Sequence, residues 1–176
     1  YGNFKFDEKG EKIKGYECDP FRHLATTKRG VPTNLFKAML NNIHFRNKFL
    51  NLFMDYGNEI MKIEKTQKLI KKFQDEYNDL AANSILRWEG FEGTKEEGIE
   101  FYLKELTDDY WAGRKEFVDN RAEFVLKKMK TYYNLKGELY NLKLTKNGGG
   151  IIKINSIIPE FDDSNKWNGK YYSDIP

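Results

Sequence analysis

The chain has 176 residues, of which 39% are hydrophobic and 15% aromatic, and this apolar content excludes a disordered protein. Its 30 basic and 27 acidic residues leave a net charge of only +3, with Lys interleaved among Glu and Asp, which argues against a nucleic-acid partner. Cys18 is the single cysteine, which excludes an internal disulfide, and no apolar run approaches the ~20 residues of a membrane span.

The first third of the chain predicts a short hairpin, a loop and two helices. Residues 1–17 alternate weakly around a DEKG turn, and residues 18–31 show no clear period, which is typical of a loop. Apolar residues then recur at helical spacing from Pro32. A polar break at residues 41–42 separates this helix from a second one, which we expect to stop at Gly57.

A third helix is expected from about residue 62 to residue 80. Five apolar residues follow a helical period and are expected to face inward: Leu69, Ile70, Phe73, Tyr77 and Leu80. Residues 81–93 contain two glycines, so we expect a turn or an irregular link to follow.

Two more helices have recognisable starts. Thr94 and Glu97 have the spacing of a capping box, in which a hydroxyl accepts from the third backbone amide while the Glu reaches back. Thr107, followed by two aspartates, predicts the start of the longest helix, over about 108–133, because acidic residues favour the positive end of a helix.

The pattern changes near 134–138, where period-two alternation replaces helical spacing. Two alternating arms flank the sequence KNGGG, so we expect a β-hairpin over 139–157 with this glycine turn at its tip. Four apolar residues are expected to cover one face of the hairpin: Leu142, Leu144, Ile152 and Ile154.

The last residues give two alternatives. The aromatic side chains of Trp167, Tyr171 and Tyr172 can fold back as a lid on the apolar face, or residues 159–176 can be a disordered stub. In either case the pattern divides the chain into a helical region, residues 1–134, and a β tail, residues 135–176.

Candidate catalytic groups are few. His23 and His44 lie far apart without neighbouring metal ligands, so we expect structural roles for both. Asp108 and Asp109 are explained by helix capping, although general acid/base catalysis is an alternative. Asp162 and Asp163 are expected in a solvated turn, and the alternative is a cation site in a loop.

The long predicted helix carries two arginines on an aromatic face, because Arg114, Phe117, Arg121 and Phe124 recur at helical spacing. Unpaired buried guanidinium groups are costly. We therefore expect both arginines to bridge to carboxylates or backbone carbonyls of neighbouring helices; the alternative is an anionic ligand. The pair at 87–88, Arg-Trp, is expected to form a cation–π or bidentate anchor before a glycine turn.

In their order, these elements resemble the C-terminal half of the CotH kinase family, over about residues 31–176. An Asn-x-x-Phe-Arg-x-x-Phe element of that family matches Asn42, Phe45, Arg46 and Phe49. The family's Arg-Trp pair matches Arg87 and Trp88, and its arginine-bearing helix matches Arg114 and Arg121. The tail from residue 146 onward is similar to a small β module that follows the kinase part in many secreted members.

The resemblance implies a mainly α fold, a helical bundle like the C-lobe of an atypical protein kinase followed by a C-terminal β-hairpin. It also implies ATP and Mg²⁺ as cofactors of the intact parent, and an extracellular, cell-surface or spore-coat location. Coat or other extracytoplasmic proteins would be substrates, and neighbouring domains of the parent would be partners. Phosphoryl transfer needs a lysine on the phosphates and a metal-holding Asp. The family's Trp-Asp-x-Asp stretch is missing here and is expected upstream of Tyr1, so the fragment itself is expected to be inactive.

The alternative function is a non-catalytic interaction module at a cell surface or in a cellulosome. In that interpretation the aromatic residues of KWNGKYY, residues 166–172, supply the contact surface.

Overall fold

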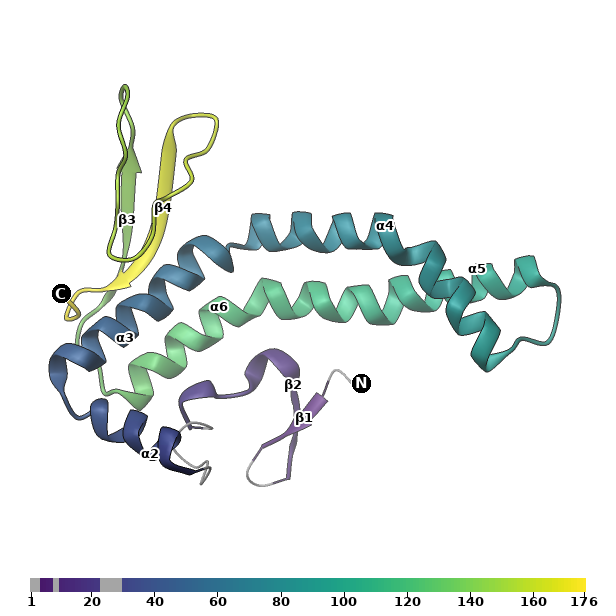
Figure 1. The fold of residues 1–176 in the computed structure, drawn as a ribbon, viewed down its shortest axis with the longest axis horizontal. Coiled ribbons are helices and arrows are strands. Elements are labelled where there is room, and N and C mark those ends of the chain that lie inside the picture. The colour runs from purple at the N-terminus through teal and green to yellow at the C-terminus, as the bar shows by residue number, and fades with distance from the viewer. Residues whose placement is uncertain (1–3, 8–9, 23–29) are drawn as a thin grey trace. The chain divides into compact units, whose positions relative to one another are not determined.

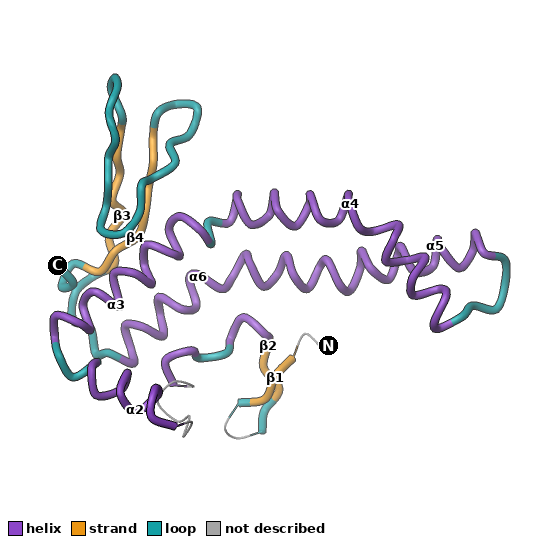
Figure 2. The backbone as a smooth tube through the Cα atoms, in the orientation of Figure 1, coloured by secondary structure: helices purple, strands orange, loops and turns teal. Residues whose placement is uncertain are grey.

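A computed structural model describes the chain at residues 4–7, 10–22 and 30–176. The fold is mainly helical and ends in a two-stranded antiparallel sheet (Figures 1 and 2), as the sequence predicts.

The chain forms two compact units, each built from two separate segments. Tyr1–Tyr16 and Ile63–Arg121 form the first unit, and Glu17–Lys62 and Ala122–Pro176 form the second. The β tail therefore belongs to one unit with helical residues, and the division between units does not fall at the boundary expected near 134–138.

The first unit begins with the expected hairpin, in which β1 (Phe4–Phe6) pairs antiparallel with β2 (Lys12–Lys14). The short 3-10 turn η1 (Gly15–Glu17) follows β2. Part of the expected turn, residues 8–9, lies outside the described residues. In the segment expected as a loop, residues 20–22 are helical, while His23 and the rest of 23–29 lie outside the described residues.

Four helical elements complete the first unit and lead into the second: α4 (Ile63–Glu89), α5 (Lys95–Glu105), η3 (Leu106–Trp111) and α6 (Ala112–Tyr132). α4 and the first part of α6 run antiparallel, with α5 between them in the chain (Figure 1). A hydrogen bond from Gln67 Nε2 to Asp119 Oδ1 (2.6 Å) joins α4 to α6, and one from Trp111 Nε1 to Asn78 Oδ1 (3.0 Å) joins η3 to α4.

The expected helix end at residue 80 is wrong, because α4 continues through most of the segment expected to be irregular. It ends at Glu89 and is followed by Gly90, whose φ of 74° is the left-handed conformation that favours glycine just after a helix. The capping box that starts α5 is confirmed, since the Thr94 side chain accepts from Glu97 N and the Glu97 side chain accepts from Thr94 N.

The expected start of a new helix at Thr107 is wrong. Its hydroxyl donates to the Leu103 carbonyl oxygen (2.9 Å), four residues back within the same helical stretch, instead of accepting from the next turn. Asp108 and Asp109 lie in the wide π-helical turn η3, which joins α5 to α6 without a break. A hydroxyl can satisfy either a preceding carbonyl or a following amide, and the sequence does not show which.

The inward face expected for α4 is wrong for four of its five residues, while Ile70 is half-buried. Leu69, Phe73, Tyr77 and Leu80 are exposed to 51%, 42%, 45% and 66%. Of residues 63–121, only Ala82, Gly98 and Leu106 are buried, and the half-buried residues of α4 include polar and small ones such as Asn78 and Ala81.

The second unit contains α2 (Gly30–Met39), α3 (Ile43–Asp55) and the π-helical turn η2 (Tyr56–Ile60). The break at 41–42 is confirmed. The expected helix stop at Gly57 is wrong, because the backbone passes through it in η2, where Met61 N donates to Tyr56 O over five residues.

The strands of the β tail pair differently from those of the expected hairpin. β3 (Leu139–Thr145) pairs with β4 (Lys166–Tyr172), which places Leu144 opposite Trp167, and not with residues 151–157. Asn155 adopts a left-handed conformation (φ 45°) inside a small bridge between Ile154 and Ile157, which reverses the chain where a strand was expected. Figure 2 shows the long connection between the two strands.

The core of the second unit confirms the lid interpretation of the last residues and contradicts the disordered stub. Trp167, Tyr171 and Tyr172 are buried together with residues from α3 and α6. The full cluster consists of Phe21, Leu50, Met54, Met129, Trp167, Tyr171, Tyr172 and Ile175. Because these aromatics are buried, KWNGKYY does not supply the exposed contact surface of the alternative function.

Candidate functional site

Asp55 and Glu59 are the buried charged side chains among the described residues. They lie four positions apart, on the continuous helical stretch formed by α3 and η2. A buried carboxylate is costly unless hydrogen bonds satisfy its oxygens. The donors that surround these two residues therefore define the best-built polar site of the second unit.

The carboxylate of Asp55 accepts four hydrogen bonds from the β tail. Its Oδ1 accepts from the Tyr171 hydroxyl (2.8 Å) and from Asn155 Nδ2 (3.3 Å). Its Oδ2 accepts from the backbone N–H (2.9 Å) and the hydroxyl (2.6 Å) of Ser156. A carboxylate offers about four acceptor positions, so Asp55 has none to spare for a ligand.

Glu59 holds the tail one helical turn further along. Its Oε2 accepts from Trp167 Nε1 (2.9 Å) and from the backbone N–H of Glu160 (3.4 Å). The indole N–H needs a partner when the ring is buried, and Glu59 supplies it at the edge of the aromatic core. The carboxylate thus permits Trp167 to be buried completely.

Asn58, between the two acids, binds the backbone of β4. Its Nδ2 donates to the Lys170 carbonyl oxygen (2.9 Å), and its Oδ1 accepts from the Lys170 N–H (2.8 Å). The amide therefore pairs with a strand residue in both directions, as a neighbouring strand would. Gly169 is required beside it, because an added Cβ would lie 3.0 Å from Asn58 Cγ and would overlap the Trp167 ring.

We call Asp55, Asn58 and Glu59 the tail clamp. The side chains of all three form hydrogen bonds with β4 or with the connection that precedes it. Burial raises the pKa of the Tyr171 hydroxyl, and its hydrogen bond to Asp55 raises it further, so the proton stays on Tyr171. In chemical terms the clamp recognises the chain's own tail and offers neither a free base nor an open metal position.

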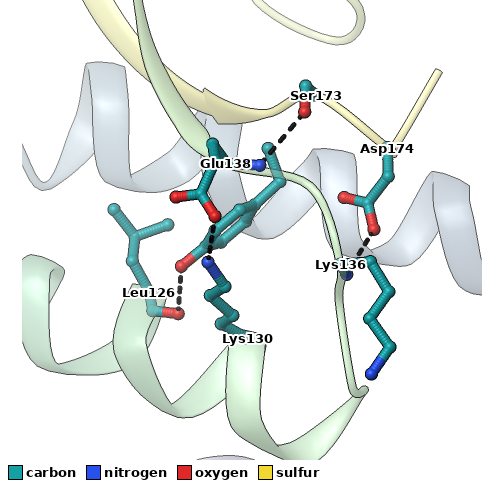
Figure 3. Close-up of polar contacts among 7 residues, drawn as sticks. Leu126, Lys130, Lys136, Glu138, Ser173 and Asp174 are labelled. Atoms are coloured by element: carbon teal, nitrogen blue, oxygen red, sulfur yellow. Dashed lines mark hydrogen bonds and ion pairs between the residues drawn. The ribbon is translucent and has the colours of Figure 1, made fainter.

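A second set of contacts fixes the tail to the end of α6 (Figure 3). The Tyr172 hydroxyl donates to the Leu126 carbonyl oxygen (2.9 Å), and Lys130 Nζ lies 3.1 Å from Glu138 Oε1. The Glu138 N–H donates to the Ser173 hydroxyl (3.1 Å). The tail is thus held from both α3 and α6.

Asp174 closes the base of the hairpin by accepting from the Lys136 N–H at 2.9 Å (Figure 3). Burial by itself would raise the pKa of Asp174, but the backbone N–H groups of Gly137 and Lys136 together lower it below its ordinary value. The charged form of Asp174 therefore stabilises the turn between α6 and β3.

The residues of the Asn-x-x-Phe-Arg-x-x-Phe element lie together at the start of α3. The Asn42 side chain caps this helix by accepting from His44 N (2.9 Å) and Phe45 N (3.1 Å). The Phe45 and Phe49 rings lie 5.8 and 5.1 Å from Phe36 on α2, both edge-on. The aromatic contacts of these residues explain why α2 and α3 pack.

Arg46 faces the aromatic residues near the end of α6. Its Nε is buried and has no hydrogen-bond partner in the part of the chain that the structure describes. Burial raises the pKa of the nearby Tyr133 to about 12, and the positive charge of Arg46 acts in the opposite direction. The guanidinium is therefore partly buried beside Tyr133.

The pair Arg87 and Trp88 lies at the exposed end of α4. The guanidinium carbon is 5.6 Å from the centre of the Trp88 ring, within the usual range of a cation–π contact. Trp88 is nevertheless 77% exposed, so the pair forms an open surface feature before the glycine turn.

The structure separates the two arginines of the long helix. Arg121 bridges as expected, since its Nη1 donates to the Tyr16 carbonyl oxygen (2.6 Å) and holds the segment after β2 against α6. The bridging role expected for Arg114 is wrong, because its Nη1 donates to Tyr110 O (3.1 Å) one turn back, and its guanidinium stacks on the Tyr110 ring. Arg114 is exposed, so solvent and its own helix satisfy it.

Both acidic pairs are exposed. Asp108 and Asp109 lie exposed on η3. Asp162 Oδ1 accepts from Ser164 N and Lys166 N (both 2.9 Å), as in a solvated turn. Across 4–7, 10–22 and 30–176, no three His, Cys, Asp or Glu side chains are arranged to hold a metal. Within the same ranges, none of the helices is long and apolar enough to cross a membrane.

Comparison with protein families, with curated proteins and with solved structures found no match to this chain.

The tail clamp is not evident in the sequence pattern. Asp55 and Glu59 follow an apolar helix stripe at a spacing of four, and this pattern could have suggested two buried acids on one face. Their donors come from residues 155–171, so the sequence alone could not show that the acids are paired with the tail.

Proposed function

We propose that this chain is the helical C-terminal part of a CotH-like atypical protein kinase and supports phosphoryl transfer without performing it. The proposal rests on the resemblance of residues 31–176 to the C-terminal half of that kinase family. The intact parent protein would use ATP and Mg²⁺ to phosphorylate extracytoplasmic or coat proteins. No chemical step is assigned to this chain.

The observation that supports a non-catalytic role is that the carboxylate of Asp55 is fully hydrogen-bonded. A kinase needs carboxylates that are open to a metal ion and to an acceptor hydroxyl. The buried carboxylates of this chain are occupied by Ser156, Tyr171 and Trp167. They hold a β tail against the helices that carry the family's Asn-x-x-Phe-Arg-x-x-Phe element, which is the work of a scaffold.

Two measurements test the proposal. Incubation of the 176-residue chain with radiolabelled ATP, Mg²⁺ and a protein acceptor is expected to give no labelled product above a control without the chain. The complete product of the same gene is expected to contain a Trp-Asp-x-Asp stretch and to label the acceptor. Transfer by the chain alone would refute the supporting role. A complete gene product without that stretch would refute the kinase assignment.

A further inference from the structure

α4 carries an exposed apolar stripe that the rest of the first unit does not cover. Leu69, Phe73, Tyr77 and Leu80 follow one another at spacings of four, four and three, and so share one face of the helix. Their exposed fractions are 51%, 42%, 45% and 66%. Contiguous exposed apolar surface of this kind marks an interaction site more often than an ordinary solvated face.

A row of charges borders the stripe on one side. Lys68, Lys72, Glu76 and Asp79 each precede a residue of the stripe by one position, and all four are exposed. The row is divided by sign, with both lysines toward the start of α4 and both acids toward its end. A helix face with this division is complementary to the same face running in the opposite direction.

We propose that α4 pairs with α4 of a second copy of this chain, antiparallel, about a two-fold axis near Gln74. In this arrangement Lys72 of each copy lies near Glu76 of the other, and Lys68 lies near Asp79. Leu69 meets Leu80 across the axis, while Phe73 and Tyr77 lie at its centre. The contact is isologous, so it closes at a dimer.

The charges select this arrangement over a parallel one. In a parallel pair the charged rows of the two copies lie on opposite sides of the contact and cannot meet, whereas the antiparallel pair brings them together with opposite charges facing. The stripe spans only about three helical turns, less than a standard interface, so we expect a weak dimer that exchanges with monomer.

Sedimentation equilibrium of the full chain over about a hundredfold range of concentration tests the proposal. We expect a monomer–dimer equilibrium whose dissociation constant rises about tenfold or more for Leu80→Glu, because a charge replaces an apolar contact at the interface. Ile151→Glu is the matched control, since Ile151 is 80% exposed but lies outside α4, and it is expected to leave the constant unchanged.

A charge-reversal mixture tests the antiparallel direction. The double variant Lys68→Glu, Lys72→Glu makes the row wholly acidic, and the double variant Glu76→Lys, Asp79→Lys makes it wholly basic. Each alone is expected to associate about tenfold more weakly than the native chain, and a one-to-one mixture is expected to recover dimer. The quadruple variant, which exchanges the two halves, should again dimerise alone.

Four results would overturn the proposal: a monomer at every concentration, a dimer unaffected by Leu80→Glu, single-sign variants that dimerise as well as the native chain, or a quadruple variant that stays monomeric. A monomer with Phe73 and Leu80 protected from labelling would show that another part of the same chain covers the stripe. Unchanged circular dichroism of each variant confirms that its helices remain folded.

Discussion

The hydroxyl of Tyr171 lies 2.8 Å from Oδ1 of Asp55, although the two residues are 116 positions apart in the sequence. This bond and those from Ser156 make a buried carboxylate on α3 dependent on the β tail. The stability of the second unit should therefore respond to either partner.

Replacement of Asp55 by Ala is expected to destabilise the second unit by about 3 kcal/mol, because it leaves buried donors of Ser156 and Tyr171 unpaired at about 1–3 kcal/mol each. Urea unfolding followed by circular dichroism measures the loss. Asp75→Ala on α4 is the control, because Asp75 pairs only with the exposed Lys71, and a change within about 0.5 kcal/mol is expected. Equal effects of both substitutions would contradict the clamp.

Gly169→Ala is expected to weaken the docking of β4, because the added Cβ would overlap the Trp167 ring and crowd Asn58. Overpacking of this kind typically costs about 1–3 kcal/mol. Gly149→Ala is the matched control, since nothing lies within 4 Å of its Cβ position. Thermal unfolding should separate the two variants, and equal melting temperatures would show that β4 does not sit closely on η2.

The second unit should lose stability in alkali. Burial raises the pKa of Tyr133 from 10.0 to about 12, so its protonated form stabilises the fold fully below pH 10, and this contribution is lost as the pH rises through about 12. Tyr133→Phe should flatten the decline in stability between those values. Tyr56→Phe, at an exposed position, controls for loss of a hydroxyl. An unchanged slope for Tyr133→Phe would contradict the burial of this hydroxyl.

The two arginines of α6 should differ in effect. Arg121→Ala removes the bond to the Tyr16 carbonyl oxygen and is expected to cost about 1–2 kcal/mol. Arg114→Ala removes a contact within one exposed helix, and a change within about 0.5 kcal/mol is expected. Melting curves of both variants test this difference. An unchanged melting temperature for Arg121→Ala would show that the bridge contributes nothing.

Local signals in the sequence predicted local structure well. Thr94 and Glu97 form their capping box, and the break at Asn42 caps α3, because both depend on residues within one helical turn. Gly57 and Thr107 were misinterpreted because a π-helical turn accommodates the backbone at each place without ending the helix. Nothing in the short-range pattern distinguishes a wide turn from a stop.

Tertiary contacts, such as which strand pairs with β3 and which face of α4 is covered, could not be predicted from the sequence pattern. Residues 151–157 alternate suitably to pair with β3, but β3 pairs instead with β4, whose aromatic side chains Trp167, Tyr171 and Tyr172 lie in the core. The outward face of α4 was likewise assigned inward, because periodicity shows that apolar residues share a face without showing which face is covered. The tail clamp depends on the first of these contacts, because its donors come from β4 and the connection before it.

The bond between Gln67 and Asp119 has a consequence for the order of folding. Residues 63–121 interrupt the second unit in sequence, so the contacts between α3 and β4 must close a loop of more than a hundred residues. Closing such a loop costs conformational entropy that grows with its length. A helical segment that first closes on itself through Gln67 and Asp119 shortens the loop that remains. We therefore expect the helices of 63–121 to assemble early, and changes at this bond to slow the arrival of β4 without altering any residue of the core that it completes.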